Sequence, residues 1–299
     1  MADNQHEKQY TTEWSFSFEE LGDRVGSFIK SLGADDAIQT ERFSEPVGSA
    51  TSASIRLDTP VGTTVVKKLG GDALIDAEIT HIGEVKFAVV GDSEKQVTLS
   101  QRNDAADWMR GIFGWIGNMR RLRWEVGLTP SIPLSLDMHS GVGESTFDLR
   151  DLALTGVNIH GGTGEMDVWL PVTAERLRAE INGGIGEIDV TVPAGANLDL
   201  FIRAGTGEIN LDIGEGAALY AKIKGGVGQT NVRVAPGAAV HVKANIGLGD
   251  LNIPSSYTRL REDDTFVGKS GTWQTLGFET AERQITIEYE GGVGELRVR

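Results

Sequence analysis

Over most of the chain, apolar and polar residues alternate with a period of two, in short segments bounded by glycine. One such segment runs from Ile188 to Val192, and the next runs from Leu198 to Ile202 after a turn that contains Pro193. This alternation is typical of β-strands that bury one face and expose the other. The pattern therefore predicts an all-β fold in which successive strands are joined by tight turns.

A Gly-x-Gly motif, followed in most copies by Glu, closes each pair of predicted strands. The second glycines are separated by 21, 22, 21, 21, 21 and 45 residues, and they are Gly143, Gly164, Gly186, Gly207, Gly228, Gly249 and Gly294. Gly62 and Gly83 continue the 21-residue spacing upstream. Two strands and two corners per repeat predict a single-stranded-coil β-solenoid with about 21 residues per coil and nine to ten coils. We expect positive φ at the corner glycines, where a Cβ atom would be unfavourable.

Several segments do not follow the repeat, and they divide the chain. Residues 1–13 are polar, which predicts a disordered tail. The pattern in residues 14–50 predicts a segment that leads into the first coil and begins with an amphipathic helix over 14–33. We expect this helix to cap the first coil, because an uncovered coil exposes a strand edge. The solenoid then spans residues 51–299, with a helical insertion at 103–123 and a loop insertion at 255–278.

The repeats resemble those of the toast-rack family, which includes the LiaF-like C-terminal β-solenoid domains of bacterial envelope-stress proteins. Residues Gly184–Pro193 and Glu290–Val298 carry the resemblance, which extends over residues 50–299. The residues that are shared form the scaffold. The resemblance implies the same fold and a non-enzymatic, often membrane-linked role in envelope-stress signalling or scaffolding.

Charge and composition narrow the classes of function. The chain has 28 basic and 43 acidic residues, a net charge of −15 that disfavours nucleic acid and anionic lipid as partners of the whole molecule. It contains no cysteine, which excludes disulfides and thiolate chemistry. The polar N-terminal residues do not form a signal peptide, and no apolar stretch is long enough to span a membrane. We therefore expect a cytoplasmic protein.

Polar residues recur at equivalent positions of successive coils, but their pattern does not predict catalysis. An acidic column follows the corners and comprises Glu144, Glu165, Glu187, Glu208 and Asp250. A glycosidase needs two carboxyl groups in different environments, whereas repeated residues share one environment. We interpret the column as a solvated acidic face, opposite a basic face that includes Arg178, Arg203 and Lys222. Rods with such faces can pair laterally.

The histidines offer one further candidate cluster. His139 and His160 are 21 residues apart and are expected to stack on adjacent coils. The following coils place Asn182 and Arg203 at this position, which disfavours a metal site. We expect no cofactor, no metal and no catalytic residue, and hence no enzyme.

The insertion at 103–123 is the first candidate interaction segment. Its candidate contact residues are Trp108, Ile112, Phe113, Trp115, Ile116, Arg120 and Arg121. Aromatic residues flanked by arginines suit a membrane interface, but glycines within the segment weaken a free-standing helix. The segment is expected to dock on the solenoid, on a protein partner or on a membrane surface.

The last repeat strand supplies a second set of candidate contacts, Glu295, Val298 and Arg299. We expect this strand either to expose an open edge that another copy can join, or to be covered by the 255–278 insertion. The sequence thus predicts a scaffold or interaction module that binds copies of itself, end to end or laterally, or another protein. Peripheral membrane binding through the insertion is the alternative hypothesis, and a carbohydrate-active β-helix enzyme is a weaker one.

Overall fold

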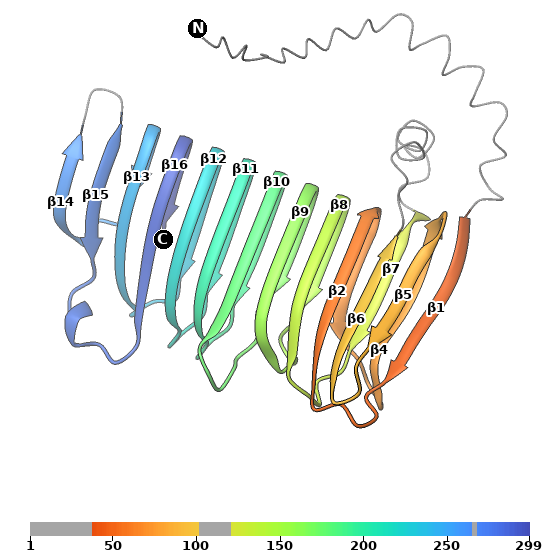
Figure 1. Cartoon of the computed structure of the whole chain (residues 1–299). Helices are drawn as coiled ribbons and strands as arrows, with labels where there is room; N and C mark the ends of the chain where they lie inside the picture. Colours follow the sequence, from red (N-terminus) through yellow and green to blue (C-terminus); the bar gives the residue numbers. More distant parts are fainter. Residues whose placement is uncertain (1–37, 102–120, 265–267) are drawn as a thin grey trace, which may run out of the picture.

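The computed structural model describes residues 38–101, 121–264 and 268–299, and its strands form one continuous open sheet (Figure 1). The predicted tail, the predicted helix over 14–33 and residues 103–120 of the predicted insertion lie outside these ranges. In the described part of the chain, no helix is both long enough and apolar enough to cross a membrane. The described structure is all-β, as the sequence predicts.

Long parallel strands, each carrying one Gly-x-Gly corner, form the central part of the fold. They are β8 (Leu134–Asp148), β9 (Leu154–Trp169), β10 (Leu177–Val192), β11 (Asn197–Ile213), β12 (Ala218–Val234), β13 (Ala239–Asn252) and β16 (Gln284–Val298). We call the layer built from the first halves of these strands face 1, and the layer built from the second halves face 2. Neighbouring strands pair in register through the corner, so that Glu165, Glu187 and Glu208 are directly aligned.

The period-two pattern places alternate side chains in one core between the two faces. Val190 and Val192 of face 2 and Leu198 and Leu200 of face 1 are each at most 1% exposed. They belong to a single cluster of buried residues that runs the length of the sheet. Since apolar burial contributes about 1.5–3 kcal/mol per large side chain, this ladder accounts for the stability of coils that lack helices.

The corner glycines have the backbone conformation that the sequence predicts. The second glycine of each motif has φ between +136° and +147°, a region that side chains with a Cβ atom rarely adopt. A Cβ atom on Gly207 would also overlap the carbonyl oxygen of Gly186 on the preceding coil. Both backbone conformation and close packing of coils therefore require glycine there.

The N-terminal strands are not stacked in simple chain order. They are β1 (Ile38–Pro46), β2 (Ser52–Val61), β3 (Thr63–Lys68), β4 (Ala73–Ile82), β5 (Val85–Val90), β6 (Glu94–Gln101) and β7 (Arg123–Leu128). Strands β2 and β3, which flank the Gly62 corner, pair with β8, whereas β4 and β5 run antiparallel to β7 and β6. Only three residues connect β5 to β6, and a connection this short forces antiparallel pairing. The Gly83 corner between β4 and β5 therefore belongs to a reversed coil.

The C-terminal strands also depart from the predicted order. Strand β16 lies between β12 and β13, pairing with both over most of its length, as its dark blue ribbon shows in Figure 1. The expectation that the last repeat exposes an open edge is therefore wrong. Residues 255–278 contain two strands, β14 (Thr258–Asp264) and β15 (Lys269–Gln274), and reach a short 3-10 helix, Phe278–Thr280.

The position of β16 has a local cause. Strand β15 pairs antiparallel with the first half of β13, from His241 to Ile246, and β14 pairs with β15. This hairpin follows β13 directly in the chain and occupies its outer edge on face 1. Strand β16 therefore takes the place between β12 and β13, where both of its edges are paired.

Candidate functional site

A row of exposed aliphatic side chains follows the edge of the solenoid at which the corners lie. Each is the middle residue of a Gly-x-Gly motif, and we call the row the corner ridge: Val142 (43% exposed), Ile185 (60%), Val227 (52%), Val293 (46%) and Leu248 (62%). The flanking glycines hold the middle residue at the apex of a sharp bend, so its side chain faces solvent instead of the core. The repeat pattern predicts corners at these motifs but not the ridge, and the aliphatic residues between the glycines are the signal in the sequence that points to it.

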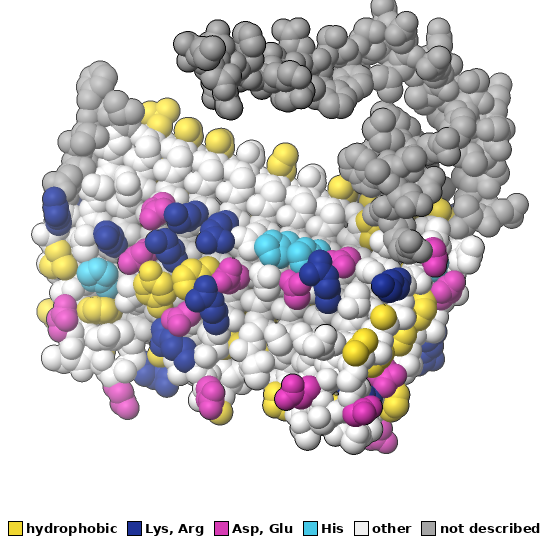
Figure 2. All heavy atoms as spheres, in the orientation of Figure 1, with side chains coloured by type: hydrophobic (Ala, Val, Ile, Leu, Met, Phe, Trp, Pro, Cys, Tyr) yellow, Lys and Arg dark blue, Asp and Glu magenta, His cyan; other side chains and the backbone are white. Residues whose placement is uncertain are grey.

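Strand register places the residues of the corner ridge in one line, with an unbroken run of three. Val227 is aligned with Val293, which is aligned with Leu248, so three aliphatic residues stand on consecutive strands. Thr206 and Thr163 fill the remaining positions on either side of Ile185. Figure 2 shows the result as yellow side chains along the upper edge of the molecule. Such an ordered apolar row on an acidic protein is typical of an interaction surface.

The described flanks of the predicted aromatic insertion lie at the same edge of the solenoid. They are Gln101, at the end of β6, and Arg121, which is exposed. Leu122 is buried against the corner of the adjacent coil, and its carbonyl oxygen accepts a hydrogen bond from the Thr63 amide. The corner ridge and the attachment points of the insertion therefore share one edge.

The predicted acidic column lies on face 2, next to a second column of Asp and Asn residues. Asn210 donates a hydrogen bond to Glu187 over 2.9 Å, and Asn231 donates one to Glu208 over 2.7 Å. The preceding coils have Asp189 and Asp167 where these amides stand. Burial, together with neighbouring carboxylates, raises the pKa of Asp167 and of Glu187. Both shifts have the same direction, so the column does not provide the contrasting acid and base of a glycosidase.

Replacing Asp189 with Asn is expected to stabilise the fold by about 1 kcal/mol at neutral pH. An amide at position 189 would stand where Asn210 stands one coil later, and would donate to Glu165 as Asn210 donates to Glu187. It would also remove a negative charge that raises the pKa of Asp167 and Glu187.

Because a carboxyl group with a raised folded pKa destabilises the fold while ionised, the gain should shrink as pH falls through the folded pKa values. Chemical denaturation of the wild type and the Asp189→Asn variant, from neutral pH to acidic pH, measures the difference in free energy of unfolding. Asp199→Asn on face 1 is the control, since Asp199 is paired with Arg176 at 2.7 Å and should lose stability or remain unchanged. Equal stability of the Asp189→Asn variant and the wild type at neutral pH would contradict the proposed hydrogen bond.

Face 1 is not the basic surface that the sequence predicts. Lys224 forms an ion pair with Glu290 at 2.7 Å, Lys222 approaches Glu288 at 3.8 Å, and Arg178 pairs with Glu180. The acidic partners come from alternate positions of the same strand or from the inserted strand β16. Basic and acidic side chains are accordingly interspersed on the face shown in Figure 2. Lateral pairing of a basic face with an acidic face is therefore not supported.

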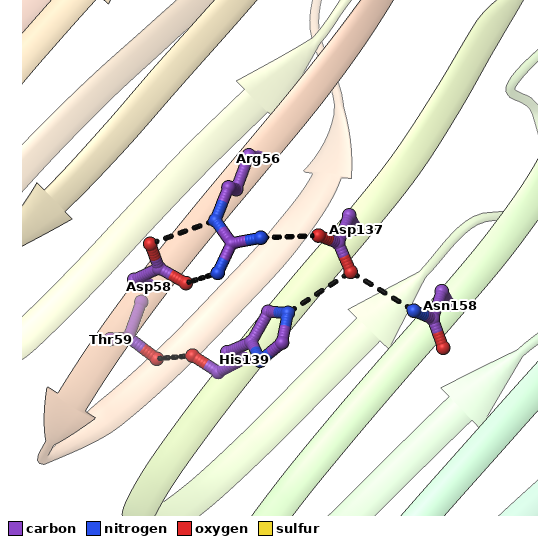
Figure 3. A network of polar contacts seen from close by, with 6 residues as sticks. All are labelled: Arg56, Asp58, Thr59, Asp137, His139 and Asn158. Atoms are coloured by element: carbon purple, nitrogen blue, oxygen red, sulfur yellow. Dashed lines mark hydrogen bonds and ion pairs between the residues drawn. The ribbon is translucent and has the colours of Figure 1, made fainter.

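A compact polar network joins β2, β8 and β9 on face 1 (Figure 3). Asp137 is at its centre. One of its carboxylate oxygens lies 3.0 Å from His139 Nε2 and accepts a hydrogen bond from Asn158 at 3.1 Å. The other oxygen accepts a hydrogen bond from Arg56 at 2.8 Å. Arg56 is also held by both oxygens of Asp58. The His139 and His160 rings stack with centroids 4.7 Å apart, as the 21-residue spacing predicts.

Asp137 is a member of this cluster that the histidine spacing alone does not predict. The available signal was the period of two, which puts Asp137 and His139 on the same side of β8, and Asn158 and His160 on the same side of β9. Asn182 and Arg203 lie on the next two strands, as expected, and Arg203 donates to Asn182 at 3.2 Å.

Apart from Arg121, which is described and exposed, the candidate contact residues from the sequence fall into two groups. Trp108, Ile112, Phe113, Trp115, Ile116 and Arg120 lie outside the described residues. Glu295 and Val298 belong to β16 inside the sheet, where Val298 is 3% exposed and Glu295 accepts a hydrogen bond from Arg297. The backbone of Arg299 bonds to Val232 and Val234. These C-terminal residues thus hold β16 in place.

Comparison with known proteins assigns the family. Residues 31–191, more than half of the chain, match the profile described as the N-terminal domain of toast_rack, DUF2154. The chain belongs to the toast-rack family. The stacked coils with glycine corners are thus the toast-rack scaffold, and the matched region includes the His139 network. No curated protein matches the chain.

The solved structures that match this toast-rack chain are distant from it in sequence. A candidate cell adhesion protein from Clostridium sporogenes has 17% identity and a TM-score of 0.43, covering 87% of this chain and 98% of its own. A candidate adhesin from Bacteroides fragilis has 13% identity and a TM-score of 0.38, covering 88% and 97%. The family assignment rests on the profile match.

Proposed function

We propose that this toast-rack chain is a non-enzymatic scaffold that associates laterally with a second copy of itself through the corner ridge. The context that the family resemblance suggests is envelope-stress signalling or scaffolding in a bacterium. A cytoplasmic location is a separate part of the proposal. The ridge is the observation that carries the proposal, because it combines exposed aliphatic side chains with a regular spacing along a rigid sheet.

Regular spacing supports self-association in particular. The ridge residues stand on adjacent paired strands, which are about 4.8 Å apart in any β-sheet. A second copy presents the same spacing, so two antiparallel ridges can interdigitate over several coils in an isologous contact. Burying Val227, Val293 and Leu248 against another copy would remove apolar surface from water without burying a charge.

Removing the aliphatic side chains of the ridge is expected to shift the protein toward the monomer. The variant carries Val227→Ser, Val293→Ser and Leu248→Ser, which keep the net charge and replace exposed residues only. Sedimentation velocity over a range of concentrations should give a dissociation constant at least about tenfold weaker than for the wild type, equivalent to ~1.4 kcal/mol.

Val172→Ser with Leu276→Ser is the matched control, because these residues are 55% and 97% exposed but lie outside the ridge. It should associate as the wild type does. A wild type that remains monomeric at all concentrations, or a ridge variant that associates unchanged, would refute the proposal.

A membrane surface is the second candidate partner, favoured by the shared edge of the corner ridge and the aromatic insertion. The net charge of −15 opposes binding to anionic lipid. Co-sedimentation with anionic and with neutral vesicles distinguishes the two. The membrane would be supported instead if the wild type stays monomeric but binds vesicles, and if the ridge variant no longer binds them.

A further inference from the structure

The His139 network contains three side chains that can each supply a metal ligand. The ligand atoms of Asp137, His139 and His160 all lie within 4.8 Å of one another, and each side chain is partly exposed. Two imidazoles and a carboxylate are the donors that zinc and neighbouring first-row divalent metals prefer. This set comes from two strands of a rigid parallel sheet, so its geometry does not depend on a loop.

The existing distances are close to those a metal requires. Zinc binds nitrogen and oxygen ligands at about 2.0–2.2 Å, so neighbouring ligand atoms in a tetrahedral site are roughly 3.3 Å apart. His139 Nε2 and Asp137 Oδ1 are already 3.0 Å apart. The His160 ring is stacked nearly parallel to that of His139, with 17° between their planes, so the His160 side chain has to rotate before one of its nitrogens faces the same point.

The surrounding residues orient this set and limit its charge. Arg56 contacts the Asp137 oxygen that faces away from His139, and its own charge is balanced by Asp58. Asn158 donates to the oxygen that faces His139, while its own side-chain oxygen is buried and has no hydrogen-bond partner within the described structure. That oxygen points away from Asp137 and His139 in Figure 3, so the hydrogen bond donated by Asn158 is the side chain's only contact with the carboxylate in the described structure. Supporting contacts of this kind fix ligand orientation in known metal sites.

We propose that Asp137, His139 and His160 bind one divalent transition metal ion of the zinc class, with water completing the coordination. The metal takes the place of the proton between His139 Nε2 and Asp137 Oδ1 and links β8 to β9 through His160. The proposal rests on this geometry and is independent of self-association.

Isothermal titration of the full chain with zinc chloride tests the proposal, and cobalt absorption spectra report the coordination. We expect one equivalent of zinc to bind the wild type and to raise its unfolding temperature. His139→Ala, His160→Ala and Asp137→Asn should each weaken binding at least about tenfold, since loss of outer-shell partners alone has effects of that size. All three residues are on the surface, and circular dichroism verifies that the variants fold.

His241→Ala is the matched control, because His241 lies on face 1 of β13 and packs against Phe278 away from the network. It should bind zinc as the wild type does. Absence of zinc binding by the wild type, unchanged binding by His139→Ala and His160→Ala, or an equal loss in His241→Ala would overturn the proposal.

Discussion

Alanine at Gly207 is expected to destabilise the fold by roughly 3 kcal/mol or more, one of the largest effects of any single methyl group in this chain. Two independent causes add at this position. Gly207 has φ of +137°, and an added Cβ atom would overlap the carbonyl oxygen of Gly186 on the neighbouring coil. The coils cannot separate locally, because the strands on both sides of the corner are paired in register.

Substitutions at two other glycines distinguish the effect of the positive φ from the effect of crowding between coils. Gly195 has φ of +73° and open space around its Cβ position, so Gly195→Ala should show conformational strain alone, about 1 kcal/mol. Gly205 has no positive φ, but its Cβ would lie 2.6 Å from the Gly184 carbonyl oxygen, so Gly205→Ala should show crowding alone. Denaturant titration of the three variants measures the differences. A Gly207→Ala protein no less stable than Gly195→Ala would exclude coil crowding as a cause.

Removing β16, by ending the chain at Glu282, is expected to abolish folding of the C-terminal coils. Strands β12 and β13 would each lose a paired neighbour, and the core would lose a set of side chains at most 4% exposed: Ile285, Ile287, Tyr289, Leu296 and Val298. At about 2 kcal/mol for each buried side chain, the loss is roughly 10 kcal/mol, similar to the whole stability of an ordinary domain. Thermal unfolding and limited proteolysis measure it.

A peptide of residues 283–299 should restore the structure when added to the shortened chain, because the gap it fills offers unpaired backbone on both sides. The same peptide with Ile287→Asp is the control, since Ile287 is fully buried and a charge there is unfavourable. If the shortened chain unfolds at the same temperature as the wild type, and the peptide does not bind it, then β16 is not an internal strand.

The sequence predicts the coils better than their order. Each coil is specified locally, by the alternation around residues such as Val190 and by a glycine such as Gly186, where a Cβ atom would overlap the backbone of the neighbouring coil. The order depends on competition between edges: the turn between β5 and β6 reverses one coil, and the β14–β15 hairpin takes the edge that β16 would otherwise join. This competition is between strands that are distant in the sequence, so the 21-residue period alone does not predict which strand pairs with which.

The candidate surfaces follow the same rule. The stack of His139 on His160 could be predicted, because it depends only on the period. The charge of face 1 could not, because Lys224 finds its partner Glu290 on a strand that is distant in the sequence. The corner ridge was accessible from the sequence, but an aliphatic residue between two glycines does not by itself show which way its side chain points.

The internal position of β16 also makes the order of synthesis matter. Strand β13 is made before β16, and its corner follows that of β12 by the same 21 residues that separate correctly stacked coils. Until β16 is made, β12 and β13 each have an unpaired edge. Pairing of β16 with both strands is therefore the step that completes the sheet, and non-local strand pairing of this kind is slow. A chain released before this step would present an unfilled gap, which the β16 of a second molecule fits as well as its own.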